Sequence, residues 1–239
     1  KDLSLYKGGI PSRFGGRASS VLDIYQKDGN SNKFSMNGGI GLISSRLLAE
    51  GPIVKDKGSF LIAGRGSYAH LCLKLTDNKN SAYFYDLNTK LNYKLNENNN
   101  LYLSGYFGRD IFNLNESFRN IYGNSTLNMR WNHLFSDKLF SNLSVIYSNY
   151  FYGLELDFIG FNWESTIQNY NLKYYSSEKT KFNFGVNVTK YDINPGTIEP
   201  LDENSSINFR QLDKKYAFEN GLYADIEHNL TDKVSVMAG

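Results

Sequence analysis

The chain has 239 residues, a net charge of +2 at neutral pH and a mean hydropathy of −0.46. The near balance of charge gives no reason to expect a nucleic-acid partner, and no run of about 18 apolar residues predicts a transmembrane helix. The first residues, Lys1-Asp2-Leu3, lack the apolar stretch of a signal peptide. Cys72 is the single cysteine, so the chain forms no internal disulfide.

The N-terminal part is a glycine-rich run, residues 8–17, followed by an extended stretch that ends at Lys27-Asp28-Gly29. Paired glycines permit positive φ angles and close backbone approach, so the run predicts an irregular loop. Val21, Leu22, Ile24 and Tyr25 favour a strand. We therefore divide the chain into a small segment, residues 1–30, and a repetitive segment, residues 31–239.

The repetitive segment predicts a series of strands and no helix. Residues 83–95 alternate most clearly, with Tyr83, Tyr85 and Leu87 on one face and Phe84, Asp86 and Asn88 on the other. This period of two is that of a strand. The predicted strands span residues 33–40, 42–53, 59–71, 83–95, 101–113, 123–135, 139–154, 164–176, 182–191 and 215–230, and an eleventh begins at 234.

The lengths of the strands and of their connections indicate a membrane barrel. Strands of roughly 10–16 residues exceed the usual length in globular proteins. Short turns (137–138, 178–180, 231–233) alternate with longer connections (74–81, 116–121, 157–162, 194–213), as in an up-and-down barrel with tight turns at one rim and long loops at the other. A soluble sandwich or propeller shares the alternation but not these lengths.

Aromatic and charged residues fit the same architecture. Tyr and Phe lie near strand ends, where a barrel carries its interfacial aromatic girdle. Charged residues lie opposite the apolar faces, where they would line a wet lumen: Asp86, Lys90, Lys94, Arg130, Lys173, Asp225 and Glu227. The sequence therefore predicts an all-β protein, a transmembrane antiparallel up-and-down β-barrel. The last strand is unfinished at residue 239, so we expect a fragment of a longer protein.

The N-terminal third carries a resemblance to a known family. Residues 6–17 (YKGGIPSRFGGR), Ser19-Ser20-Val21-Leu22-Asp23-Ile24 and Lys27-Asp28-Gly29 resemble the end of the plug domain of TonB-dependent outer-membrane receptors, in their Bacteroidota type. Ile43-Ser44-Ser45-Arg46-Leu47, Glu50-Gly51-Pro52-Ile53 and Gly58-Ser59-Phe60-Leu61-Ile62 resemble that group's first barrel hairpins. The match covers roughly the first 70 residues.

The resemblance implies a fold and a function. The family has a 22-strand barrel closed by an N-terminal plug, so the chain would hold the plug's tail and about eleven strands. The implied function is energised import across the outer membrane of a siderophore, glycan, peptide or vitamin. The implied partners are TonB, acting through a segment upstream of this sequence, the outer-membrane lipid and a surface lipoprotein lid. No cofactor is implied.

Two groups of residues are candidates for functional contacts. Arg13 and Arg17 could hold the plug to the barrel wall, with Glu50 as a partner, because guanidinium–carboxylate pairs are strong and directional. Aromatic residues in or near the long loops could contact a ligand, since they combine area with a polar handle; these are Phe118, Tyr122, Phe158, Phe161 and Trp163. Both groups also have plainer interpretations, as lumen charges and girdle residues.

Catalysis has no support in the sequence. His70, His133 and His228 lack the spacing of a metal site, and no nucleophile or phosphate-binding motif occurs. Three functions remain: a plugged importer, a receptor-like barrel that serves as a structural or assembly component of an outer-membrane complex, and a passive porin. The glycine-rich plug tail weighs against the porin.

Overall fold

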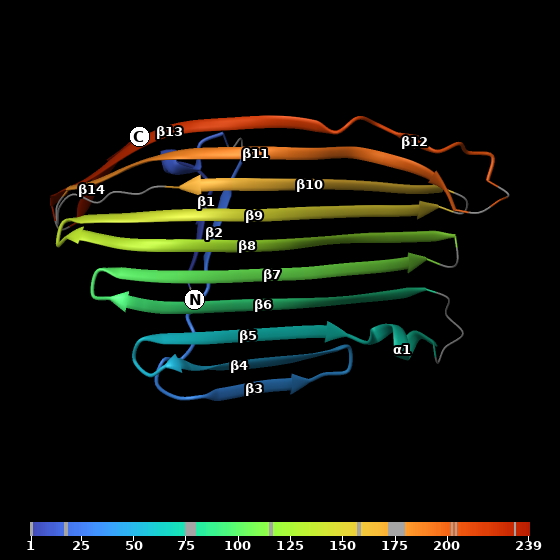
Figure 1. Ribbon diagram of the computed structural model, residues 1–239, viewed down its shortest axis with the longest axis horizontal. Coiled ribbons are helices and arrows are strands. Elements are labelled where there is room, and N and C mark those ends of the chain that lie inside the picture. The colour runs from blue at the N-terminus through green and yellow to red at the C-terminus, as the bar shows by residue number, and fades with distance from the viewer. Residues whose placement is uncertain are drawn as a thin grey trace.

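A computed structural model describes residues 2–16, 19–74, 80–114, 117–156, 159–171, 180–201, 203, 205–231 and 233–239 (Figure 1). For residues 2, 72–74 and 159–171 it describes the backbone alone.

The N-terminal segment forms a small unit of its own. Strand β1 (Asp2–Tyr6) pairs antiparallel with β2 (Val21–Tyr25), and a short 3-10 helix, η1 (Ser12–Phe14), lies between them. The strand at 21–25 was predicted, whereas β1 was not. Both strands cross the strands of the main sheet at a steep angle (Figure 1).

The rest of the described chain is one long antiparallel sheet. Eleven strands follow one another in sequence order, each hydrogen-bonded to the next, and the short β12 pairs with β11. The strands are β3 (Ser35–Ile40), β4 (Ser44–Val54), β5 (Gly58–Ser67), β6 (Ser81–Asn96), β7 (Asn99–Leu114), β8 (Phe118–Ser136), β9 (Leu139–Leu156), β10 (Ile159–Asn171), β11 (Thr180–Pro200), β12 (Arg210–Gln211), β13 (Lys215–Thr231) and β14 (Val234–Ala238). This up-and-down order confirms the predicted all-β barrel wall.

Two predicted boundaries were wrong at the rim of the long connections. The strand predicted for 59–71 ends at Ser67, and a helix follows, α1 (Ala69–Lys74). Six residues are too few to show a helical period in the sequence. The connection predicted for 116–121 is instead the start of β8 at Phe118, because β7 and β8 stay paired out to Leu114 and Phe118.

The predicted long connection 194–213 is also shorter than expected, because β11 continues to Pro200. Pro195 and Gly196 both lie opposite Trp163, between the pairs Glu164–Asn194 and Asn162–Thr197. This is a β-bulge, which accommodates a proline without an N–H group and a glycine with a positive φ of 134°. The Pro-Gly pair, a turn signal in the sequence, thus bends the strand without ending it.

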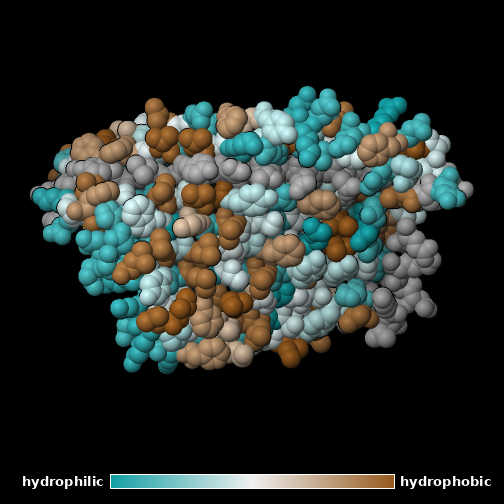
Figure 2. Space-filling model, viewed as in Figure 1, coloured by the Kyte–Doolittle hydropathy of each residue, from teal (hydrophilic) through white to brown (hydrophobic). Residues whose placement is uncertain are grey.

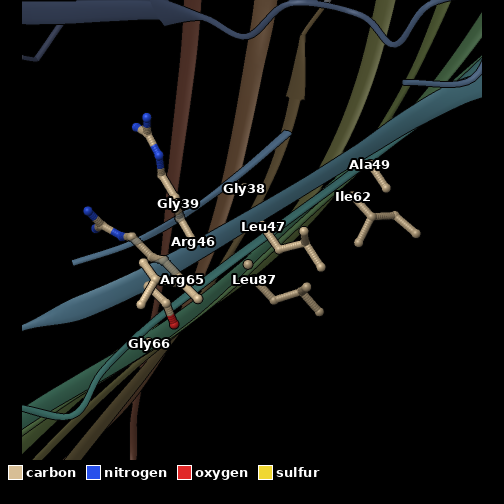
Figure 3. A pocket seen from close by; sticks show the side chains of 12 residues that line it. Gly38, Gly39, Arg46, Leu47, Ala49, Ile62, Arg65, Gly66 and Leu87 are labelled. Atoms are coloured by element: carbon tan, nitrogen blue, oxygen red, sulfur yellow. The ribbon is translucent and has the colours of Figure 1, made fainter. Parts of the chain in front are cut away.

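The sheet has two different faces. One carries exposed apolar side chains from successive strands, among them Leu87, Leu91, Leu103, Met129 and Val145. Figure 2 shows apolar side chains gathered over the middle of the strands. The alternation is visible at β3–β6, where Arg46 and Arg65 point to one side and Leu47, Ile62 and Leu87 to the other, around a groove of about 860 Å³ (Figure 3).

Among the described residues, no helix is long and apolar enough to cross a membrane.

The tight pairing of β7 with β8 generates a stability prediction. A Cβ atom at Gly123 would lie 2.6 Å from the carbonyl oxygen of Gly108, so Gly123→Ala must shift backbone and should cost about 1–3 kcal/mol of unfolding free energy. At Gly66 the nearest atom would be 3.9 Å away, so Gly66→Ala should be neutral or slightly stabilising. Urea unfolding of the two variants in detergent measures both values, and equal stabilities would contradict the prediction.

Candidate functional site

Hydrogen bonds hold the N-terminal segment against the polar face of the sheet. The first group of them lies on β11 and β13, near the C-terminal end of the chain. The backbone N–H of Ser12 donates to Asp225 Oδ1 at 2.8 Å, and its hydroxyl donates to the carbonyl of Ala224 at 3.1 Å. Asn187 Nδ2 donates to the carbonyl of Arg13 at 3.3 Å. These bonds join η1 to β11 and β13, whose residues lie about two hundred positions further along the chain than η1.

A second contact anchors the end of the segment to β6. Lys90 Nζ donates to the carbonyl of Gln26 at 2.6 Å and lies 2.7 Å from Asp28 Oδ1. The Lys90 side chain is only 7% exposed, and its ammonium also lies 4.7 Å from the centre of the Tyr25 ring. A buried ammonium is stable only when it is paired and hydrogen-bonded, so Lys90 requires the N-terminal segment beside it.

A third contact lies on β4. Lys27 Nζ contacts both carboxylate oxygens of Glu50 at 2.9 Å, and the Ser35 hydroxyl donates to Glu50 Oε1 at 3.2 Å. Glu50 is 13% exposed, whereas Lys27 is 47% exposed. The pair therefore fixes a largely buried carboxylate next to the point where the chain enters the sheet.

Gly29 explains how closely the segment approaches the sheet. A Cβ atom there would lie 2.1 Å from the carbonyl oxygen of Phe60 in β5. No side chain fits against that backbone, so only glycine allows this approach.

Of the two arginines proposed for the plug contact, Arg13 lies among the described residues. The Arg13 guanidinium stays within the N-terminal segment, where it contacts the Tyr6 hydroxyl at 3.3 Å, Asp23 at 3.9 Å and the Phe14 ring at 4.6 Å. Its contact with the sheet is through its backbone carbonyl. Arg17 lies outside the described residues, so its pairing with Glu50 stays a prediction.

Sequence reasoning missed the residues that make most of the contacts. It placed Lys90 and Asp225 on the polar face but did not connect them to the N-terminal segment. Lys27 and Asp28 were interpreted only as the end of the extended stretch and as part of the family motif. The sequence alone could not pair these residues. Any charged residue on the polar face is an equally good partner for Lys27 or Asp28 until the register of the sheet is known.

The ligand candidates lie mostly in strands. Phe118 and Tyr122 belong to β8, four residues apart and therefore on one face. Phe118 packs edge-on against Phe112, with ring centres 6.3 Å apart. Phe158 lies outside the described residues, and Phe161 and Trp163 lie in β10, where the backbone alone is described. A ligand-binding role for these five residues stays a prediction.

Strand register adds one residue to this set. Tyr122 pairs with Tyr152 of β9, and Tyr152 pairs in turn with Trp163 of β10. The three positions form one row across three strands, towards the rim of the long connections. Tyr122 is 43% exposed, and Tyr152 accepts a hydrogen bond from Asn120 at 3.0 Å. Tyr152 could not be singled out from the sequence, because the row exists only in the paired sheet.

Among the described residues, no group of three His, Cys, Asp or Glu side chains is placed to hold a metal ion.

Comparison with known proteins identifies the fold. No family model matches the chain, and no curated protein matches its sequence. Among solved structures, the chain is similar to "Copper transporter OprC", with a TM-score of 0.75 and 10% sequence identity over 98% of this chain. The chain spans 40% of the length of that protein. At this identity the likeness shows a shared fold, the antiparallel β-barrel wall.

The buried Lys90 generates a prediction about the N-terminal segment. Lys90→Met keeps the length of the side chain but leaves Asp28 and the Gln26 carbonyl without this donor. Hydrogen bonds to charged groups are worth about 1.5–3 kcal/mol, so amide hydrogen exchange in residues 21–30 should quicken roughly tenfold to hundredfold. Mass spectrometry of exchanged peptides measures this rate.

Lys181→Met is the matched control, because Lys181 pairs with Glu227 at 3.4 Å within the sheet and both side chains are over one-third exposed. It should leave exchange in residues 21–30 unchanged. Unaltered exchange in the Lys90 variant would show that the contact does not hold the segment.

Proposed function

We propose that this chain is the plug tail and part of the barrel wall of an outer-membrane transporter of the TonB-dependent kind. Residues 1–30 are the end of the plug and residues 31–239 belong to the barrel. The observation that carries the proposal is the attachment of the N-terminal segment across the polar face, through Ser12 and Asp225 at one end and Lys90 and Asp28 at the other. A wide barrel is an open channel unless such a segment fills it.

The proposed activity is energised import of a siderophore, glycan, peptide or vitamin. Ligand would bind at the rim of the long connections, where Tyr122, Tyr152 and Trp163 share one register row. Aromatic side chains provide large contact area with a polar edge, which suits all four ligand classes. TonB would act on the plug from the periplasm, through the part of the plug upstream of this sequence.

The remaining partners follow from the same proposal. The apolar face of the sheet would contact outer-membrane lipid, and a surface lipoprotein could cover the long connections. The motifs between Tyr6 and Gly29 support the Bacteroidota type through their resemblance to that group. The name of the structural neighbour assigns copper transport to that protein.

Conductance in a planar bilayer tests the plug. The complete protein should conduct poorly, and deletion of everything before Gly29 should give a large steady conductance, because the Ser12, Lys27 and Lys90 contacts are then lost. Mild urea should open the intact protein reversibly, since polar contacts hold the tail. A large steady conductance of the intact protein without urea would overturn the plugged transporter and favour the porin.

Arginine substitutions test the membrane face. Val145, 41% exposed on the apolar face, should tolerate arginine poorly, with a loss of about 2–4 kcal/mol near the bilayer midplane. Asn124→Arg is the control, since Asn124 is exposed on the opposite face of the adjacent β8. Asn187 would be a poor control, because its amide contacts Arg13. Equal losses of unfolding free energy in lipid vesicles would contradict the assignment of faces.

A further inference from the structure

A cavity of about 420 Å³ lies between the N-terminal segment and the polar face of the sheet. The segment contributes Ile24, Tyr25 and Gln26 to one side. The sheet contributes residues from four neighbouring strands, β6 to β9, among them Lys90, Tyr102, Tyr106, Asn128 and Arg130. This volume is within the range of small-molecule sites.

The charged residues that line the cavity are both cations, Lys90 and Arg130. Lys90 is neutralised by Asp28 at 2.7 Å. Arg130 has no ion pair within the described part of the chain, and its Nε atom is buried there without a hydrogen-bond partner. The cavity therefore carries one positive charge that these residues do not compensate.

The surroundings of Arg130 fix its orientation. Its guanidinium lies 4.4 Å from the centre of the Tyr102 ring and 5.7 Å from that of Tyr25. Stacking on aromatic rings satisfies the faces of a guanidinium and leaves its N–H edge for hydrogen bonds. One ring belongs to the wall and the other to the N-terminal segment, so Arg130 is held where the two meet.

A second polar group lies beside it. Asn128 is two residues from Arg130 on the same face of β8, and its Oδ1 atom is also buried without a hydrogen-bond partner among the described residues. Buried polar groups are normally hydrogen-bonded, and leaving them unpaired destabilises the protein. The Asn128 oxygen accepts and would be paired by a donor, whereas the Arg130 Nε–H and its excess charge require an anionic acceptor.

We propose that this cavity binds a small organic carboxylate. The Arg130 guanidinium donates hydrogen bonds to the carboxylate, and the rings of Tyr25, Tyr102 and Tyr106 enclose the apolar part. The site goes beyond the proposed import of a ligand at the rim, because it lies beneath the N-terminal segment, at the level of Lys90. Since Tyr25 contributes to it, a bound carboxylate stabilises the contact between the segment and the wall.

Titration of the complete protein in detergent with benzoate tests the proposal by calorimetry. Benzoate should bind saturably, and Arg130→Gln should weaken binding roughly tenfold to hundredfold, as expected for loss of a charge-assisted hydrogen-bonded pair. Benzamide, the neutral analogue, should bind far more weakly than benzoate. Arg119→Gln is the matched control from the same strand, because Arg119 pairs with Glu155 at 3.4 Å, and it should bind benzoate as the unaltered protein does.

A second variant keeps the test decisive if Arg130→Gln does not fold. Arg130→Lys retains the charge but loses the planar pair of donors, so it should bind benzoate with intermediate affinity. Three results would each overturn the proposal: benzoate does not bind, benzoate binds the Arg130 variants as tightly as the unaltered protein, or benzamide binds as tightly as benzoate. The Arg130 charge would then be assigned to a carboxylate of the protein itself. The calorimetric titration measures binding and not transport. Its result therefore does not depend on the result of the conductance test.

Discussion

The alternation of side chains along paired strands is the constraint on which the rest of this structure depends. Each strand presents successive residues to opposite faces, and the register carries that division from β3 to β14. Lys90 therefore pairs with Leu61 and Ser104 on the polar face, while Leu91 pairs with Phe60 and Leu103 on the apolar one. A slip of one residue in any pair would exchange the two faces from that point onwards. Every contact of the N-terminal segment relies on this register, because Glu50, Lys90 and Asp225 must all point to the same side.

The N-terminal segment is held by polar contacts at separate places and not by a continuous apolar interface. Its strands leave Leu3, Leu22 and Ile24 at least half exposed, whereas its anchors to the sheet are hydrogen bonds and ion pairs through Ser12, Lys27 and Asp28. These anchors differ in exposure, since the Lys90 side chain is 7% exposed and the Lys27 side chain is 47% exposed. The attachment therefore depends on a few polar contacts, each of which a single substitution can remove.

The polar face also separates two kinds of environment. Towards the rim of the long connections, Tyr122, Tyr152 and Trp163 form one register row of aromatic residues. Nearer the short turns, Lys90 and Arg130 concentrate positive charge under the end of the N-terminal segment. Aromatic rings occur in both places, but in the second they stack on cations from the wall. The two ends of the polar face thus differ in their side chains, with a row of aromatic positions at one end and the cations that contact the N-terminal segment at the other.

The sequence by itself determined the all-β class, the strand order, the two faces and the short extended stretch at Val21–Tyr25, because these depend on local periodicity and turn residues. It misjudged α1, which is too short to show a period, and the Pro195–Gly196 bulge, where pairing with β10 overrides a turn signal. Only the tertiary structure decided that Lys27 contacts Glu50, that Ser12 contacts Asp225 and that Tyr152 joins Tyr122. A lumen carries many similar charges and aromatic rings, and their composition is compatible with many pairings. The choice among them is made by register and by the path of the N-terminal segment, which bring residues as far apart as Ser12 and Asp225 within hydrogen-bond distance.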